Sequence, residues 1–431
     1  MTKEEFQKCL QTLTKTERTI LDRYLQGMTQ SQIVEQTDYS ENVVYKRLAN
    51  ACRKFGFEKP EGGYYKEIRK AVVELFIQYA PEQVNHAAFG YPAPTLSTSS
   101  KASQIIYVSR PAFEKAGYEA IHHPGGLLRI KAPTTFGKTM LLSQILTQAQ
   151  LNGCETISLS FGLAAQSVFK QLETFSKWFC AVVSHDLGRP NQIEESWTDI
   201  YASNFNTTRY FENFLLNNRD SPLVLALDDT DLVFDHPEIA LDFCKLLRGW
   251  YSKARSGRRN LWQNLRIIIV HSTENYGPLD INTSPLANVG MVIDLPEFTK
   301  EQVEELARQN GLDWTHAQTV ELMKLIGGHP KLAQSAFDHL RRGKTLSKVL
   351  QNAHTQAGIY SSHLRDCLAN LRKKTTPDLA SAFNSVISSA IPIHIEAEAT
   401  FQLYSMGLIK LEGDLAKPRN ELYRKYFQGR L

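Results

Sequence analysis

The 431-residue sequence lacks the features that mark membrane-spanning, disulfide-bonded and zinc-binding proteins. Its longest apolar runs, at 223–227 and 267–270, are far too short to cross a bilayer, and no apolar segment follows the charges of residues 1–10. The six cysteines are scattered without a CxxC spacing, so neither a zinc site nor a disulfide framework is indicated. We therefore expect a soluble cytoplasmic protein with free thiols and no membrane partner.

A strong excess of charge of one sign is also missing. The chain has 49 Lys and Arg against 45 Asp and Glu, a formal net charge of +4, which does not by itself indicate a nucleic-acid partner. Any basic face must be local. The hydrophobic fraction of 42% over this length is enough apolar material for two or three domains with proper cores.

Three helical segments are expected within the first 56 residues, at 14–26, 29–37 and 40–55. Each begins at a Thr or Ser of the kind that caps a helix, and each has an apolar face. Their spacing predicts a helix-turn-helix. A further amphipathic helix is expected at 64–79, and the Pro-, Ser- and Thr-rich stretch that follows predicts a linker.

From residue 105 onward, short apolar runs alternate with helical stretches, which is typical of a parallel sheet covered by helices on both faces. Strands are expected at 127–132, 156–161, 223–228, 267–272 and 291–295. Because the segment APTTFGKT at 132–139 lies between an expected strand and an expected helix, the predicted fold is an α/β P-loop NTPase, with an all-α helix-turn-helix domain before it and a helical lid and winged helix after it. The predicted domains are 1–80 (helix-turn-helix), 81–104 (linker), 105–297 (core), 298–345 (lid) and 346–431 (winged helix).

The segment Ala132–Thr139 follows one expected strand and precedes an apolar helix. It matches the phosphate-binding loop G-x-x-x-x-G-K-[ST] except that Ala132 replaces the first glycine. In such a loop, backbone N–H groups surround the phosphates, Lys138 reaches the terminal ones and Thr139 holds Mg²⁺. The segment predicts ATP and Mg²⁺ as cofactors, bound by residues Ala132, Pro133, Thr134, Thr135, Phe136, Gly137, Lys138, Thr139 and Met140. The replacement of the first glycine bears on hydrolysis more than on binding.

Two other expected strands end in side chains that suit the same site. Two carboxylates stand at the end of the strand 223–228. Asp228 is assigned to the metal and Asp229 to the general base, a position where many P-loop enzymes carry Glu. Asp231 either supports this loop or is a solvated turn residue. The strand 267–272 ends at the sensor position, where Ser272 or Thr273 would contact the γ-phosphate, with His271 as an alternative. The predicted catalytic residues are Asp229, Lys138 and Ser272.

Together, the segments YVSRP at 107–111, KAPTTFGKT, LVLALDDTD, IIIVHST and GGHP at 327–330 resemble the AAA-like branch of the AAA+ and STAND ATPases. The likeness covers roughly residues 105–345 and implies that Arg110 and Pro330 flank the base and ribose. Pro330 is alternatively a simple first-turn helix proline. Such ATPases often complete their site with an arginine from a neighbouring subunit, and Arg248, Arg255, Arg258 and Arg259 lie in the expected region. The sequence does not choose among them, and most are expected to be surface charges.

Residues 12–56 resemble the helix-turn-helix of response regulators and sigma factors, and still more the N-terminal module of von Willebrand/MoxR-associated conflict systems. The third helix leaves a polar face for DNA, made by Asn42, Tyr45, Lys46, Arg47, Asn50 and Arg53. Residues 1–60 carry ten basic and eight acidic side chains, a net charge of only +2. Many modules of this shape instead bind protein, so both partners stay open.

The C-terminal stretch 407–418 resembles the wing of a winged helix, followed by a helix at 420–428. We therefore expect a nucleotide-dependent switch, a slow ATPase that binds duplex DNA and forms a homo-oligomer or recruits a partner protein, in a regulatory, defence or mobile-element system. The alternative is a non-hydrolysing, nucleotide-stabilised adaptor that joins protein partners, which Ala132 and Asp229 favour.

Overall fold

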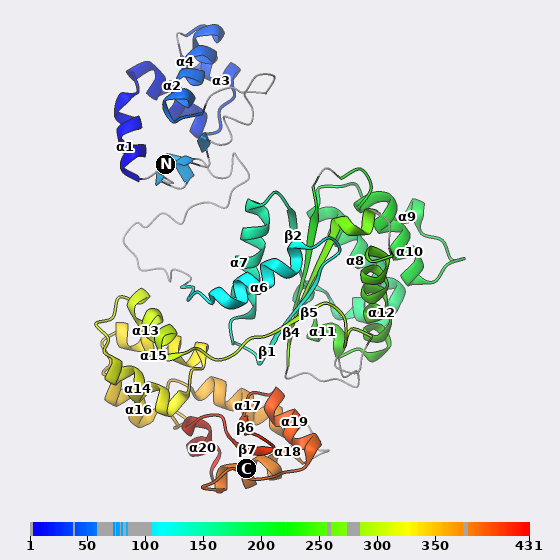
Figure 1. The fold of residues 1–431 in the computed structure, drawn as a ribbon, viewed down its shortest axis with the longest axis vertical. Helices are drawn as coiled ribbons and strands as arrows, with labels where there is room; N and C mark the ends of the chain where they lie inside the picture. Colours follow the sequence, from blue (N-terminus) through cyan, green and yellow to red (C-terminus); the bar gives the residue numbers. More distant parts are fainter. Residues whose placement is uncertain are drawn as a thin grey trace. The chain divides into compact units, whose positions relative to one another are not determined.

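The computed structural model describes residues 3–37, 39–57, 72–73, 75–77, 79–80, 83–84, 106–219, 221–256, 260–273, 285–373 and 378–431. The chain forms two compact units, Met1–Gln104 and Ile105–Leu431 (Figure 1). Most of the predicted helix 64–79 and nearly all of the predicted linker 81–104 lie outside the described ranges.

The first unit contains the expected helix-turn-helix, preceded by one more helix. Its helices are α1 (Lys3–Thr12), α2 (Lys15–Leu25), α3 (Gln30–Glu35) and α4 (Glu41–Lys54). Thr14 and Thr29 cap α2 and α3 through reciprocal hydrogen bonds with Glu17 and Gln32, which satisfy the free N–H groups of the first turn. Ser40 stands at the start of α4 without a side-chain cap. Apolar side chains of all four helices pack into one core.

A buried carboxylate ties α2 to α4 in this unit. Glu17 is only 2% exposed, and its Oε2 accepts a hydrogen bond from the Nζ of Lys54 at 2.7 Å. Burial by itself raises the pKa of Glu17, but hydrogen bonds from Lys54 and from the backbone and hydroxyl of Thr14 outweigh it and lower that pKa below its ordinary value. Glu17 therefore stabilises the unit as an anion.

The second unit is built on a five-stranded parallel sheet. Its strands are β1 (Leu127–Ala132), β2 (Glu155–Ser160), β3 (Leu223–Asp228), β4 (Leu265–Ser272) and β5 (Met291–Asp294), in the order β2-β3-β4-β1-β5. The predicted strand 156–161 lies one residue earlier, and the predicted strand 267–272 begins two residues earlier. The reason is register, because Glu155 and Leu265 both pair with Leu223 at the start of β3.

Helices cover both faces of this sheet. One face packs against α6 (Pro111–His122) and α7 (Lys138–Leu151), and the other against α8 (Leu172–Asp186), α10 (Ser203–Tyr210) and α12 (Pro237–Ala254) (Figure 1). The short helices α9 (Ile193–Ser196) and α11 (Asp231–Phe234) follow α8 and β3. The three inner strands, β1, β3 and β4, are buried along most of their length, as the continuous apolar runs predicted, whereas the edge strands β2 and β5 are partly exposed. The α/β sandwich expected from the sequence is confirmed.

After β5 the chain is mainly helical. Its elements are α13 (Lys300–Gln309), α14 (His316–Ile326), α15 (Pro330–Arg341), α16 (Leu346–Asn352), α17 (Ser361–Lys373), α18 (Leu379–Ser388), α19 (Ala397–Ser405), β6 (Ile409–Glu412), β7 (Leu415–Pro418) and α20 (Glu421–Phe427). The strands β6 and β7 form an antiparallel hairpin where the wing was expected. The predicted lid and C-terminal domain share one apolar cluster. Within the described ranges, no helix combines the length and apolarity needed to cross a membrane.

Replacing Lys54 by Met should destabilise the N-terminal unit by roughly 1–2 kcal/mol, because the buried carboxylate of Glu17 loses a charge-assisted hydrogen bond. Native-state hydrogen exchange of α2 and α4 in the full chain would measure the change. Lys8→Met, at an exposed position of α1, is the matched control and should have little effect. Since the pKa of Glu17 is lowered in the folded chain from 4.5, its stabilisation is present above pH 4.5 and is lost at lower pH. Equal effects of the two substitutions would contradict this role of Glu17.

Candidate functional site

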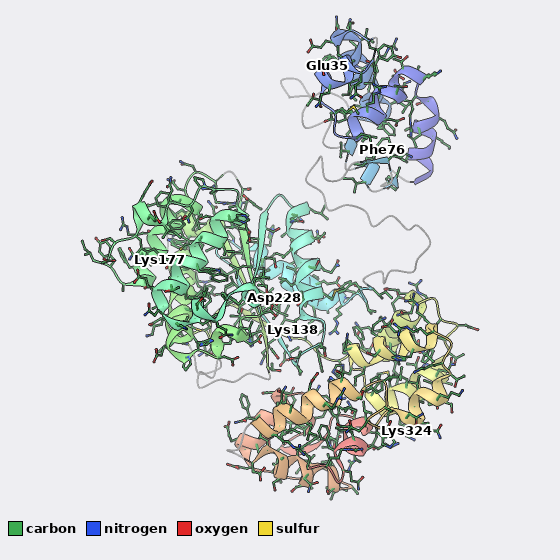
Figure 2. The ribbon with its side chains drawn as sticks, turned by 180° about the vertical axis from the view of Figure 1, so that it is seen from behind. Glu35, Phe76, Lys138, Lys177, Asp228 and Lys324 are labelled. Carbon is green, nitrogen blue, oxygen red and sulfur yellow. The ribbon has the colours of Figure 1, made fainter. Side chains whose placement is uncertain are left out.

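The ends of three strands meet at one edge of the sheet. In the pairing of β1 with β4, Ala132 lies opposite Ser272, and β3 pairs in parallel with the other side of β4. The carboxyl ends of β1, β3 and β4 therefore lie together, as parallel pairing requires. Figure 2 shows Lys138 and Asp228 close to each other at this edge.

The loop after β1 has the backbone of a phosphate-binding loop. Gly137 has a φ of 93° immediately before α7, a conformation that favours glycine. Thr135 also has a positive φ of 66°, which is rare for a β-branched residue. Backbone held in a sparsely populated region is often found at ligand sites. The turn brings the first N–H groups of α7 and the Lys138 ammonium to the mouth of the loop.

Lys138 and Thr139 connect this loop to its surroundings. The Nζ of Lys138 donates to the carbonyl oxygens of Ala132 and Pro133, each at 3.0 Å. The hydroxyl of Thr139 donates to Oδ2 of Asp228 at 3.0 Å, although the two residues are 89 positions apart. The loop thus presents a cation and a hydroxyl beside a buried carboxylate at the end of β3.

The electrostatics of Asp228 suit a cation site. Burial, together with the neighbouring charge of Asp229, raises the pKa of Asp228, while hydrogen bonds from the Asp229 N–H and from Thr139 oppose the rise. A divalent cation beside this carboxylate would favour its ionised form. No group of three or more His, Cys, Asp or Glu side chains is placed to hold a metal among the described residues. Thr139 and Asp228 supply two oxygen donors, which fits Mg²⁺ that is also held by phosphates and water.

Asp229 lies differently from its neighbour. Its φ of 55° is in the left-handed region, which Asp tolerates better than most residues, and its side chain is exposed. Ser160, the last residue of β2, donates its hydroxyl to Oδ2 of Asp229 at 2.5 Å. The predicted general base is therefore held by a serine. Sequence reasoning missed Ser160, because the two residues are distant along the chain.

The polar side chains at the end of β4 contact two different parts of the chain. The hydroxyl of Ser272 lies 3.1 Å from that of Thr134, and its N–H donates to Oδ1 of Asp231 at 3.0 Å. The hydroxyl of Thr273 instead donates to the carbonyl of Ser405 at 2.6 Å. Of the two sensor candidates, Ser272 contacts the phosphate-binding loop and Thr273 the C-terminal part of the chain. The bond from Ser272 shows that Asp231 ties the segment after β3 to the end of β4 and is not a solvated turn residue.

These side chains border a cavity of about 470 Å³, a size typical of small-molecule sites. Arg110 and Pro330 line it, as do residues of the loop. Arg110 is also a structural link, since it donates to the carbonyls of Pro296 and Phe136 and its guanidinium lies 4.5 Å from the Phe298 ring centroid. Burial lowers the pKa of Arg110 to about 10. The cavity lining is Ile106, Tyr107, Val108, Arg110, Thr134, Thr135, Gly137, Lys138, Thr139, Met140, Asp228, Asp229, Asp231, Val270, His271, Ser272, Phe298, Leu306, Pro330, Lys331 and Gln334.

Residues 95–429 match the family described as AAA-like domain, which is more than half of the chain. The chain belongs to the AAA-like domain family. Residues 3–55 match region 4 of sigma-70 factors, a helix-turn-helix module. The finer resemblance to von Willebrand/MoxR-associated modules stays a prediction. A search of curated protein sequences gave no match.

Two solved structures are similar to this AAA-like chain. It is similar to a Walker-type ATPase of Pyrococcus abyssi, with a TM-score of 0.53 and 15% identity over 74% of this chain and 96% of that one. A second similarity is to the ORC2 protein of Aeropyrum pernix in ADPNP and ADP complexes, with a TM-score of 0.45, 13% identity, and 74% and 92% coverage. The first of these similarities supports the fold of this chain.

Three predicted site residues of the AAA-like unit do not line the site cavity with their side chains. Ala132, Pro133 and Phe136 contribute backbone to the loop, but Pro133 and Phe136 border a second cavity, of about 590 Å³, behind it. A residue that sequence reasoning missed, Lys331, lies in the first turn of α15 and borders the site cavity. Lys331 directly follows the predicted pocket residue Pro330, and that neighbour is the signal that could have found it.

The predicted finger arginines have structural contacts where they are described. Arg248 donates to the carbonyl of Pro285, and Arg255 donates to that of Gly125 and stacks on Tyr251. Arg258 and Arg259 lie outside the described residues.

The predicted DNA-binding residues lie along α4 of the sigma-type module. Val44, Leu48 and Ala51 are buried, and the opposite face exposes five of the six predicted residues, with Asn50 half-buried. The Arg53 guanidinium donates to Asn50, and that of Arg47 lies 3.9 Å from Oε1 of Glu17. The structure thus gathers the predicted polar face, although Arg47 lies beside an acidic neighbour.

Buried histidines should make the AAA-like unit sensitive to mild acid. Burial lowers the pKa of His271 to about 3 and of His363 to about 4, and lowers that of His329 strongly. Unfolding exposes each to protonation near its ordinary pKa of 6.5, so stability is present above pH 6.5 and falls as the pH drops below it. Each histidine should contribute a loss of about 1.4 kcal/mol per pH unit.

Urea unfolding followed by tryptophan fluorescence would measure this loss, because all five tryptophans lie beyond residue 105. The stability difference between wild type and His271→Asn should shrink by about 1.4 kcal/mol for each pH unit below 6.5. His123→Asn, at an exposed site, serves as the control and should show a constant difference. A constant difference for His271→Asn as well would refute the effect.

Proposed function

We propose that the AAA-like unit binds ATP with Mg²⁺ in the site cavity. The observation that carries this proposal is the 3.0 Å hydrogen bond between Thr139 and Asp228 beside the Lys138 ammonium. It joins the hydroxyl and the carboxylate that together would hold Mg²⁺. The N–H groups at the start of α7 supply the anion-binding surface for the phosphates.

The residues present define what each would do. Lys138 would donate to the terminal phosphates, and Thr139 with Asp228 would hold Mg²⁺, which when bound neutralises phosphate charge. Arg110 and Pro330 would flank the base and ribose, beside the apolar side chains of Val108, Phe298 and Leu306. Lys331 on the lid would approach the phosphates when the lid closes.

We propose slow turnover rather than rapid hydrolysis. Asp229 is shorter than the usual Glu, and its carboxylate is engaged by Ser160 at 2.5 Å. A general base must be free to accept a proton from the attacking water. Ala132 in place of the first glycine adds to the same expectation. The site therefore suits a switch that changes state with each nucleotide.

The switch would act by domain closure. The site cavity is bordered by Lys138 and Ser272 of the core and by Pro330 and Lys331 of the lid, so phosphate contacts would draw these two parts together. We propose that this STAND-type change controls homo-oligomer or partner-protein assembly in a cytoplasmic regulatory, defence or mobile-element system.

A non-hydrolysing adaptor is the second candidate. The hydrogen bond from Ser160 to Asp229 favours it, because a site whose general base is engaged would bind nucleotide without hydrolysing it. In that case nucleotide would stabilise the unit while the N-terminal module joined a protein partner. ATP binding without phosphate release would distinguish this candidate from the slow ATPase.

Replacing Lys138 by Ala should weaken ATP binding about 10- to 100-fold, because one charge-assisted hydrogen bond to phosphate is lost. Titration with a fluorescent ATP analogue in the presence of Mg²⁺ would measure the affinity. Lys131→Ala is the matched control, since Lys131 lies on β1, pairs with Asp294 and does not line the site cavity. Equal affinities for wild type and Lys138→Ala would exclude the proposed site.

Phosphate release measured with the same two variants tests turnover. Slow release by wild type and by Lys131→Ala, abolished in Lys138→Ala, would support the slow ATPase. Release that is absent from all three proteins, with and without duplex DNA, would leave the adaptor as the better account.

We further propose that α4 binds duplex DNA. The support is the match of residues 3–55 to a sigma-70 region 4 module and the exposed basic side chains of Lys46 and Arg53. In such modules the second helix of the helix-turn-helix enters the major groove while basic side chains contact phosphates.

The double variant Lys46→Ala/Arg53→Ala should bind DNA more weakly and with a lower salt dependence. Removing two phosphate contacts should reduce the slope of log affinity against log salt by about 2. Fluorescence anisotropy with a labelled duplex at several salt concentrations would measure it. Lys8→Ala/Lys15→Ala removes the same charge at exposed positions away from α4 and should keep the slope. Wild-type protein that binds no duplex at low salt would end the DNA proposal.

A further inference from the structure

The phosphate-binding loop has a second face, which the C-terminal part of the chain contacts. We call this the rear contact and define it by Pro133, Phe136 and Thr273 of the core and by Ser405, Gly407 and Arg419 of the C-terminal part. The second cavity, of about 590 Å³, borders it. Among the described residues that line the site cavity, none lies beyond Gln334. The C-terminal part therefore touches the loop from behind and not the site cavity.

Three close contacts form this rear contact. Thr273 donates its hydroxyl to the carbonyl of Ser405 at 2.6 Å. The guanidinium of Arg419 lies 5.6 Å from the centroid of the Phe136 ring, within the range of a cation–π interaction.

The third contact is between Gly407 and Pro133. A Cβ added at Gly407 would lie 3.0 Å from the Cβ of Pro133, a tight contact that would push against the proline ring. Gly407 also has a φ of +71°. The backbone of Gly407 is therefore packed directly on the loop.

Lys138 connects the two faces of the loop. Its ammonium donates to the carbonyls of Ala132 and Pro133 at 3.0 Å each, and the ring of the same Pro133 packs on Gly407. The ammonium has three protons, two of which these carbonyls accept, so a phosphate group in the loop shares the ammonium with them and draws it towards itself. Phosphate binding thus acts on the peptide that the C-terminal part holds in place.

We propose that the C-terminal part restrains the loop through the rear contact, so that nucleotide phosphates and the rear contact oppose each other. This inference rests on the proposed nucleotide binding and adds its regulation. Because coupling is reciprocal, whatever loosens the rear contact tightens nucleotide binding, and nucleotide loosens the rear contact. A partner that pulled the C-terminal part away would in this way load the site.

Two variants loosen the rear contact without touching the site cavity. Gly407→Ala pushes a methyl group against Pro133, and Arg419→Met removes the cation over Phe136, while Glu297 keeps its ion pair with Lys410 at 2.7 Å. Both should bind a fluorescent ATP analogue about fivefold more tightly than wild type.

Each variant has a matched control. Gly413→Ala lies in the hairpin turn at a φ of +60°, and its added Cβ would meet no atom within 4 Å. Arg430→Met removes a cation that stacks on Tyr426 instead. Both controls should keep wild-type affinity. Unchanged or weakened binding by Gly407→Ala and Arg419→Met overturns the inference.

Hydrogen exchange of the wild-type chain tests the reverse direction without any variant. A non-hydrolysable ATP analogue with Mg²⁺ should slow exchange at the start of α7 and speed it at the amides of Leu408 and Arg419, which hydrogen-bond to the carbonyls of Leu403 and Leu408. Slowing at α7 with no change at Leu408 and Arg419 overturns the inference and leaves the proposed function intact. No change at either place, together with no measurable affinity, overturns both.

Discussion

Parallel pairing of β1 with β4 and of β4 with β3 brings the carboxyl ends of the three strands to one edge of the sheet. The candidate site depends on this register. A shift of one residue would turn Ser272 away from Thr134, because side chains alternate between faces with a period of two. The buried apolar runs of these strands fix the register by packing both sheet faces against helices. The site chemistry is therefore held by hydrophobic packing several residues away from it.

At that edge, two neighbouring carboxylates have opposite surroundings. Asp228 ends the strand in extended backbone, is buried and accepts from Thr139. Asp229 adopts a positive φ, is exposed and accepts from Ser160. The positive φ at Asp229 gives the two carboxylates different partners, although the charge of Asp229 still raises the pKa of Asp228. In the proposed function Asp228 would hold the cation, while Asp229 is engaged by Ser160, and this is the reason for proposing slow turnover.

Much of this arrangement follows from local sequence. The strands, the loop around Gly137 and the caps at Thr14 and Thr29 were predicted within one or two residues, because each depends on neighbours in the chain. Ser160 and the bond from Thr273 to Ser405 were not predicted, since their partners lie 69 or more residues away along the chain, whereas Lys331 was missed although it directly follows Pro330. Phe136 shows the limit within one motif. The loop pattern gave its position, but only the fold shows that it borders the second cavity, with its ring near Arg419, rather than the site cavity.

The end of β4 contacts both the phosphate-binding loop and the C-terminal part of the chain. Ser272 and Thr273 are consecutive residues, yet one contacts Thr134 of the loop and the next donates to Ser405 of the C-terminal part. The peptide between them donates its N–H, that of Thr273, to the carbonyl of Ala132 in the loop at 3.0 Å, so one residue contacts both the loop and the C-terminal part. The same holds for Pro133, whose carbonyl binds Lys138 while its ring packs on Gly407. Both links cross from the site to its rear within one or two residues, so communication between them needs no long pathway through the core.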